Sequence, residues 1–175
     1  MSKLRLLIAS TNPGKLKEFQ EILAGEPFDL HLPASLGIHL EVVEDGATYA
    51  QNAAKKALAY CQASGILTLA DDSGLEVDAL GGAPGLYSAR YSPLRGATDA
   101  NRRAYLLENL GAKPRPWTAR FRCSVAVASP SGDLHLTEGV CPGEIIDEER
   151  GSNGFGYDPI FLLTGRGFPL RFSNR

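Results

Sequence analysis

The sequence predicts an α/β protein, and three observations support this fold class. Near-continuous apolar runs at 4–9 and 66–70 are typical of buried central strands. Between them, apolar residues recur at the spacing of a helix. Residues 117–127 alternate apolar and polar side chains, which is the pattern of a half-buried antiparallel strand. We therefore expect a sheet with helices packed against it.

Length and composition favour one compact domain. The chain has 175 residues, of which 43% are apolar, enough for one well-buried core. A net charge of -2 and a pI near 5.9 show no broad basic field, so we expect no nucleic-acid partner. No apolar run approaches the roughly 20 residues of a membrane span, and no signal-peptide pattern follows Met1, so we expect a cytoplasmic protein without a membrane partner. The three cysteines and three histidines form no recognisable zinc-ligand pairing.

The first strand, 4–9, leads through a polar loop into a helix. The loop contains Ser10, Thr11, Asn12, Pro13, Gly14 and Lys15. Apolar residues then recur at helical spacing as far as Leu23, and Gly25 is placed to end the helix. Free N–H groups and the dipole of a helix N-terminus favour an anion, and Lys15 adds a full charge. The loop lacks the second glycine and the Lys-Ser/Thr ending of a Walker loop, so an ordinary turn with a solvated lysine is the alternative.

Two further strands and a helix follow. The strands are expected at 28–32 and 38–43, and the second leads to Glu44, which could be a metal ligand. A helix is expected from Thr48 to Ala63, with Gly65 beyond its end. On that helix Asn52 and Lys56 are four residues apart and share a face. The alternative is that Lys55 and Lys56 are simply solvated.

The strand at 66–70 is predicted to stop at two acids, Asp71 and Asp72. Successive side chains on a strand point to opposite faces, so both acids can face one ligand only if the backbone turns, as Ser73-Gly74 would permit. Acids beyond the carboxyl end of a strand are a candidate metal or general-base site, and a solvated turn is the alternative. The segment 81–92, rich in glycine, aromatic and basic residues, favours the functional interpretation.

The C-terminal part is predicted to contain a helix, a hairpin and a glycine-rich loop. Thr98 is a good N-cap for a helix through Leu110. The strand at 117–127 should return, after a turn at 130–133, along 134–140. In the loop 151–161, Phe155 could stack on a nucleobase, and Asp158 could accept hydrogen bonds or bind a metal. The alternative is a hairpin loop whose aromatic side chains pack on one another.

Five of these motifs, taken in order, strongly resemble the inosine triphosphate pyrophosphatase family, whose members are also called Ham1-like proteins. They are STNPGK at 10–15, DDSGL at 71–75, GGAPG at 81–85, YSARY at 87–91 and FGYDPIF at 155–161. The match runs from Leu4 to about Gly167. It implies a long mixed sheet flanked by helices, in an elongated, two-lobed single domain over 1–175 with a central substrate cleft. It also implies a homodimer and Mg²⁺-dependent hydrolysis of ITP, dITP or XTP to a nucleoside monophosphate and pyrophosphate, which cleanses the nucleotide pool.

The resemblance assigns roles to the matching residues. Asp72 would be catalytic, activating water, and would bind Mg²⁺ together with Glu44, with Asp71 in support. Lys56 would lie near the phosphates. The remaining substrate-binding residues would be Ser10, Thr11, Asn12, Pro13, Gly14, Lys15, Ser73, Phe155, Gly156, Tyr157 and Asp158. The first six would hold the triphosphate, and Phe155 would lie against the base. A Ser73 nucleophile is the alternative within this site, but no histidine lies near it in sequence to act as its base.

The end of the chain departs from the family pattern. Relatives continue past the aromatic loop into an acidic helical segment, a lysine and a Ser-His-Arg motif that grips the purine, and residues 168–175 do not match this continuation. We therefore expect a truncated or altered C-terminal end. The alternative function that follows is a nucleotide-binding protein with lost or relaxed catalysis.

Overall fold

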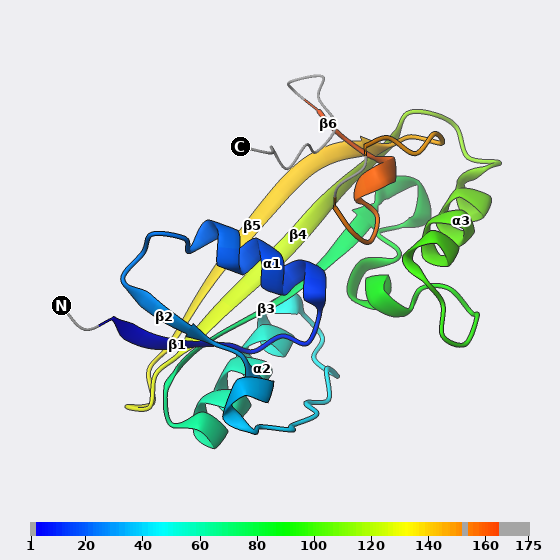
Figure 1. Cartoon of the computed structure of the whole chain (residues 1–175). Helices are drawn as coiled ribbons and strands as arrows, with labels where there is room; N and C mark the ends of the chain where they lie inside the picture. Colours follow the sequence, from blue (N-terminus) through cyan, green and yellow to red (C-terminus); the bar gives the residue numbers. More distant parts are fainter. Residues whose placement is uncertain (1–2, 152–153, 165–175) are drawn as a thin grey trace. The chain divides into compact units, whose positions relative to one another are not determined.

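The structure is a computed structural model that describes residues 3–151 and 154–164. Within these residues the strands form one sheet in the order β2-β1-β3-β4-β5-β6 (Figure 1). The strands are β1 (Leu4–Ile8), β2 (Phe28–His31), β3 (Leu67–Val77), β4 (Trp117–Ala128), β5 (Leu134–Ile145) and β6 (Phe161–Leu163). The α-helices are α1 (Pro13–Ile22), α2 (Tyr49–Ser64) and α3 (Asp99–Leu110). Short 3₁₀ turns lie at Pro33–Leu36, Asp78–Leu80, Gly85–Arg90 and Asp158–Ile160.

The sheet is mixed, as the resemblance implied. Strand β1 pairs in parallel with both β2 and β3, whereas β5 and β6 are antiparallel. Parallel neighbours require a crossover, and α1 and α2 supply the two crossovers around β1. This arrangement explains why β1 is an almost unbroken apolar run: a strand with a neighbour on each side and helices over it is buried on both faces.

The residues group into two compact units. The first comprises Met1–Asp72 and Cys123–Glu138, and the second comprises Ser73–Arg122 and Gly139–Arg175. Strands β3, β4 and β5 contribute residues to both units. Each unit has its own apolar core, described separately below.

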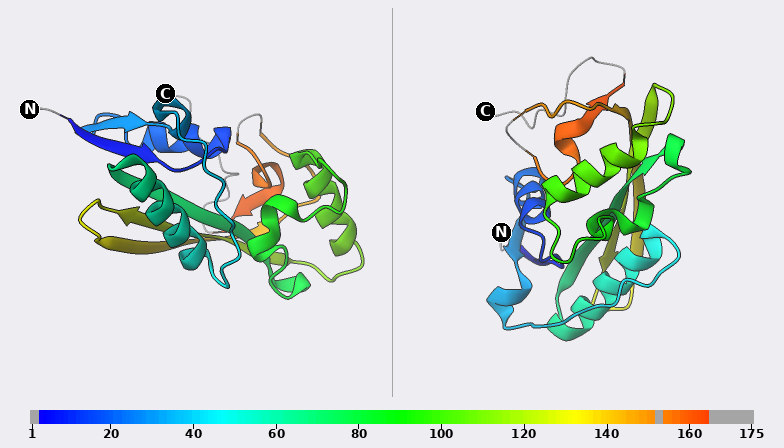
Figure 2. Two further views of the ribbon diagram at one scale, coloured as in Figure 1. Left: turned by 90° about the horizontal axis from the view of Figure 1, so that it is seen from below. Right: turned by 90° about the vertical axis from the view of Figure 1, so that its right-hand side faces the viewer.

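In the first unit, α1 and α2 cover opposite faces of β1 (Figure 2). Leu7 and Ala9 lie in a buried cluster with alanines of α2, while Leu6 and Ile8 lie in another cluster against apolar residues of α1. The alternation along β1 therefore decides which helix each side chain meets. The same alternation continues on β3, where it positions the acidic residues.

In the second unit, α3 packs through Leu106 and Leu110 into a cluster with residues of β3, β4 and β6. Tyr157 and Ile160, which follow the glycine-rich loop, are buried in the same cluster. The loop at 154–158 is thus held next to the helix by the core itself.

The predicted helix boundaries were largely confirmed. Thr98 caps α3, and Thr48 caps α2 by accepting the Gln51 N–H. Gly65 follows α2 with a positive φ of 68°, which glycine adopts without strain. Helix α1 is shorter than predicted, because it ends at Ile22, ahead of Gly25.

Two strand predictions were wrong. Residues 38–43 form no strand, because Ile38 and Val42 alternate to pack on the α2 cluster rather than to pair with a neighbour. The strand at 66–70 does not stop at the acids, since β3 runs unbroken from Leu67 to Val77. No backbone turn at Ser73-Gly74 brings the two acids to one face.

The described residues contain no helix both long enough and apolar enough to cross a membrane. Cys61 is buried, Cys123 and Cys141 are partly exposed, and all three thiols are free. Burial raises the pKa of the Cys123 thiol to about 11, so this sulfur is protonated at neutral pH.

Candidate active site

Asp71 and Asp72 are buried side by side in β3 and face opposite sides of the sheet. They are only 3% and 8% exposed. Asp71 Oδ2 lies 2.7 Å from Lys15 Nζ, at the start of α1, whereas Asp72 Oδ2 accepts a hydrogen bond of 2.9 Å from Asn52 Nδ2 on α2. A charged partner on one face and a polar partner on the other allow the strand to continue through two acids.

The acids lie just beyond the end of the neighbouring strand. Strand β1 ends at Ile8, which pairs with Leu69 of β3, and the chain then turns into the loop 10–15. Strand β3 continues alongside that loop. The prediction that the acids follow the carboxyl end of the strand at 66–70 was therefore wrong, and the acids lie instead beside the loop that follows β1.

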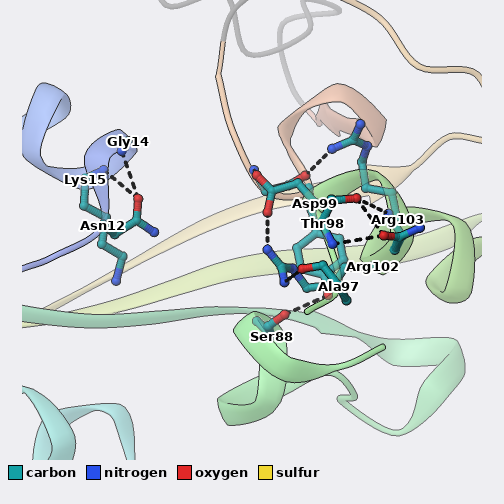
Figure 3. Close-up of polar contacts among 12 residues, drawn as sticks. Asn12, Gly14, Lys15, Ser88, Ala97, Thr98, Asp99, Arg102 and Arg103 are labelled. Atoms are coloured by element: carbon teal, nitrogen blue, oxygen red, sulfur yellow. Dashed lines mark hydrogen bonds and ion pairs between the residues drawn. The ribbon is translucent and has the colours of Figure 1, made fainter. Parts of the chain in front are cut away.

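The loop 10–15 forms a helix start that is already capped. Asn12 is the N-cap of α1, and its Oδ1 accepts the N–H groups of Gly14 at 2.9 Å and Lys15 at 3.4 Å (Figure 3). The N–H groups that the sequence suggested would be free for an anion are thus bonded to Asn12. What this loop offers an anion is the positive end of the helix dipole, the charge of Lys15 and the exposed Thr11.

Lys15 and Asp71 form a buried ion pair. Their side chains are 17% and 4% exposed. Burial alone would lower the pKa of Lys15, but the attraction and hydrogen bond of Asp71 outweigh it and raise the pKa above the ordinary value. The other oxygen, Asp71 Oδ1, is buried without a hydrogen-bond partner among the described residues.

The Asp72 carboxylate lies in a field of mixed charge. Lys56 Nζ is 2.7 Å from Glu44 Oε1, and both of these residues act electrostatically on Asp72. Burial raises the pKa of Asp72, and Glu44 adds to this, while Asn52, Lys56 and Lys15 oppose it. A carboxylate whose pKa is raised is a stronger base, which suits it to accept a proton from water.

Asn52, on α2, connects Asp72 of β3 with the segment at Gly46 that precedes the helix. It was not assigned a role from the sequence. It is 2% exposed; its Nδ2 donates to Asp72, and its Oδ1 accepts the Gly46 N–H at 2.7 Å. The spacing of Asn52 and Lys56 showed that they share a face of α2. It could not show that this face meets β3.

Gly46 is the position where an added side chain would disturb this connection most. A Cβ atom there would lie 2.6 Å from Asn52 Oδ1 and 2.8 Å from Gln51 Cβ. We expect Gly46→Ala to break the bond to Asn52 and to destabilise the fold by about 1–3 kcal/mol, the usual cost of overpacking. Chemical denaturation would measure this cost. Gly111→Ala is the matched control, because its added Cβ would meet only ordinary contacts at 3.5 Å or more, and an equal loss of stability there would contradict the assignment.

The donor set at Asp72 is suited to a hard divalent cation. Carboxylate oxygens are the protein ligands that Mg²⁺ prefers, and Mg²⁺ usually takes only one or two of them besides water and substrate phosphates. Glu44 and Asp72 supply two carboxylates that interact electrostatically. In the part of the chain that the structure describes, no group of three or more acidic, histidine or cysteine side chains forms a complete metal cage.

In the second unit, the loop 155–158 is held from within. Phe155 N–H donates to Asp158 Oδ2 at 3.0 Å, and burial raises the pKa of Asp158. Tyr157 is buried, and its hydroxyl donates to the Ser88 carbonyl at 2.9 Å. Phe155 is partly exposed. Ser88, which also accepts the Leu75 N–H, was missed from the sequence because nothing distinguishes it from an ordinary serine in a turn.

Other predicted site residues are placed as follows. Ser73 is partly exposed and follows Asp72 in β3. The mismatched end, including Ser173-Asn174-Arg175, lies outside the described residues. The roles proposed for individual residues in binding substrate stay predictions.

A mixed sheet with helices packed against it, and with the buried carboxylates of Asp71 and Asp72 beyond the end of its first strand, makes this an α/β protein. The Ham1 family model matches residues 6–169, and the chain belongs to the Ham1 family. This confirms the resemblance found in the sequence.

Similar proteins can be aligned with this chain over most of their length. The chain is 45% identical to a dITP/XTP pyrophosphatase of Bacillus subtilis, over 91% of this chain and 81% of that protein. It is 48% identical to a dITP/XTP pyrophosphatase of Desulfotalea psychrophila, over 91% of this chain and 70% of the relative. A HAM1 protein structure from Coxiella burnetii has a TM-score of 0.82 at 38% identity, covering 94% of this chain and 84% of that one. The Staphylococcus aureus Ham1 structure also gives 0.82, at 35% identity, covering 98% and 87%.

Proposed function

We propose that this chain is a Mg²⁺-dependent pyrophosphatase that hydrolyses non-standard purine nucleoside triphosphates, namely dITP, ITP and XTP, to the nucleoside monophosphate and pyrophosphate. Membership of the Ham1 family and the names of the similar proteins support a pyrophosphatase. The observation that carries the proposal is the buried Asp72, held by Asn52 and acted on by Glu44 and Lys56.

The chain's own residues supply three functions on this proposal. Lys15 and Lys56 offset the negative charge of the triphosphate, and the loop 10–15 presents a helix N-terminus to it. Asp72 accepts the proton of the attacking water. Asn52 donates a hydrogen bond to Asp72 and so helps to fix the orientation of that carboxylate.

Glu44 and Asp72 would hold Mg²⁺. When bound, the ion would neutralise phosphate charge and favour ionisation of a nearby water. No covalent enzyme intermediate is required, because a positioned carboxylate suffices to deprotonate water. This disfavours the Ser73 nucleophile.

On this proposal the loop 155–158 binds the purine base, with Phe155 stacking on it. Ser73 makes a further contact with the substrate. The partly exposed ring of Phe155, flanked by glycines, supports this assignment. We further propose that the protein acts as a cytoplasmic homodimer that cleanses the nucleotide pool. These last points follow the family resemblance.

The experiment that tests the function is pyrophosphate release by the purified full-length chain. Supplied with Mg²⁺, it should release pyrophosphate from dITP, ITP and XTP, and much more slowly from ATP and GTP. Saturable binding of dITP by calorimetry without any release would contradict the proposal and favour the nucleotide-binding alternative.

Removal of the metal should stop the reaction. With EDTA in excess over Mg²⁺, we expect release from dITP to fall by at least about 10²-fold, because the phosphate charge is then opposed by lysines alone. Adding back Mg²⁺ should restore the rate. Unchanged release in EDTA, from protein shown by elemental analysis to be metal-free, would exclude the metal-dependent mechanism.

A further inference from the structure

Helix α3 holds both main-chain polar groups of Gly156, in the loop 155–158. Asp99 Oδ2 accepts the Gly156 N–H at 2.8 Å, and Arg103 donates to the Gly156 carbonyl at 2.8 Å. Asp99 and Arg103 are four residues apart and therefore lie on the same face of the helix. Both polar groups of Gly156 are thus held by charged side chains that are 57 and 53 residues distant in sequence.

Each of these charged residues is itself fixed by an ion pair. Arg103 makes a two-pronged contact with Glu149, at 2.7 and 3.1 Å, and its side chain is only 12% exposed. Asp99 pairs with Arg102 at 2.5 Å. Burial alone would raise the pKa of Asp99, but the Gly156 N–H and Arg102 lower it, so the acid is ionised at neutral pH. Two oppositely charged, oriented groups therefore face Gly156.

Apart from the bond of the Phe155 N–H to Asp158, the loop has few other contacts that fix its partly exposed ring. Gly154 and Gly156, on either side of Phe155, have positive φ values of 94° and 59° and no side chain to pack. Tyr157 is anchored by burial, which fixes the far end of the loop. The direction of Phe155 thus depends on how the adjoining Gly156 peptide is held.

We propose that Asp99 and Arg103 are positioning residues that, by holding the Gly156 peptide, orient Phe155 to stack on the purine of the substrate. This inference rests on the proposed function. On this proposal both residues act through Gly156 and not directly on the substrate, and neither was singled out from the sequence. A purely structural clamp would lower stability without affecting how the base is bound.

The consequence for kinetics is specific. Stacking on the base acts equally in the ground state and in the transition state, because the base is remote from the bond that breaks. Asp99→Ala and Arg103→Met should therefore raise KM for dITP and XTP about ten-fold or more, with kcat changed by less than a factor of about three. The inhibition constant of pyrophosphate, which has no base, should stay at the wild-type value.

A matched set of variants separates the clamp from general damage. Asp99→Asn keeps an oxygen that accepts the Gly156 N–H, so its KM should lie between those of the wild type and Asp99→Ala. Arg115→Met removes a different arginine-aspartate pair in the same unit, with Asp147, and should leave KM unchanged. Circular dichroism identifies any variant that fails to fold, and the mild Asp99→Asn variant keeps the test open in that case.

A second measurement requires no turnover. Amide hydrogen exchange at Gly156, followed by NMR on the free protein, should be at least about ten-fold faster in Asp99→Ala than in Asp99→Asn or the wild type. Faster exchange together with raised KM and unchanged pyrophosphate inhibition supports the proposal.

Four outcomes would overturn the inference. Faster exchange with an unchanged KM would mean that the clamp is only structural. A rise in both KM and the pyrophosphate inhibition constant would mean damage to the whole site. A wild-type protein that releases no pyrophosphate from dITP or XTP would reject the proposed function, and the inference with it, whereas an active wild type with unaltered variants would reject the inference alone.

Discussion

Replacing Asp72 with asparagine should lower kcat for dITP by about 10²–10⁴-fold, the usual contribution of a general base. Asparagine has nearly the same shape and retains an oxygen for the Asn52 amide, so the geometry at β3 should persist. What is lost is the negative charge and the ability to accept a proton. Pyrophosphate release at saturating Mg²⁺ and dITP measures the effect directly.

Stability provides an independent check on the same variant. Because the folded-state pKa of Asp72 is raised, mainly by burial, the ionised acid destabilises the fold at any pH above that pKa. Asp72→Asn should therefore raise Tm at neutral pH, by about 2–4 °C for each kcal/mol gained. The advantage should shrink as the pH falls through the raised pKa of the folded state and vanish below the unfolded value of 3.8, where the acid is neutral in both states. A variant that is inactive because it has unfolded would instead show a lower Tm.

The control for Asp72→Asn is Asp147→Asn. Asp147 is an exposed acid that pairs with Arg115 and lies outside the site, so kcat should not change. Wild-type turnover by Asp72→Asn would show that another group activates the water.

Replacing Lys15 with methionine should destabilise the protein by about 3–5 kcal/mol, because it leaves Asp71 as a buried charge without a cationic partner. The loss should appear as a lower midpoint of chemical denaturation with an unchanged slope. Methionine keeps most of the length of the lysine side chain, so lost packing contributes little.

Two further variants define the origin of this effect. Lys17→Met removes a lysine from the same helix, but its partner Glu21 is 3.9 Å away and both side chains are exposed, so the change should stay within about 0.5 kcal/mol. Adding Asp71→Asn to Lys15→Met removes the stranded charge and should recover much of the lost stability. If the single Lys15→Met variant denatures at the wild-type midpoint, Asp71 does not depend on this lysine.

The local patterns of the sequence predicted the elements that are decided locally. The helix from Thr48 and the helix from Thr98 were correctly placed because capping residues and terminal glycines act within one turn. The strand predicted at 117–127 likewise matched the bounds of β4, although the polar residue Ser124 is fully buried there. These signals need no knowledge of the rest of the chain.

The errors arose where distant residues decide the outcome. Two adjacent acids normally end a strand, but β3 continues because Lys15 and Asn52, both remote in sequence, meet Asp71 and Asp72 from opposite helices. Residues 38–43 alternate like a strand, yet they cover α2 instead of pairing. The motifs predicted Asp72 and Lys15 as site residues, and these roles stay predictions, whereas the contacts of Asn52, Ser88 and Arg103 became visible only in the tertiary structure.

The opposite orientation of the two acids on β3 limits how this site can vary. Side chains on a strand change face with every residue, so inserting or deleting one residue between Leu67 and Asp71 would turn Asp71 toward α2 and Asp72 toward α1. Each acid would then meet the partner that suits the other. The fold can tolerate single substitutions along β3, but it cannot tolerate a change in the length of the strand. Relatives of this protein should therefore accumulate insertions in the loops while the number of residues in this strand stays the same.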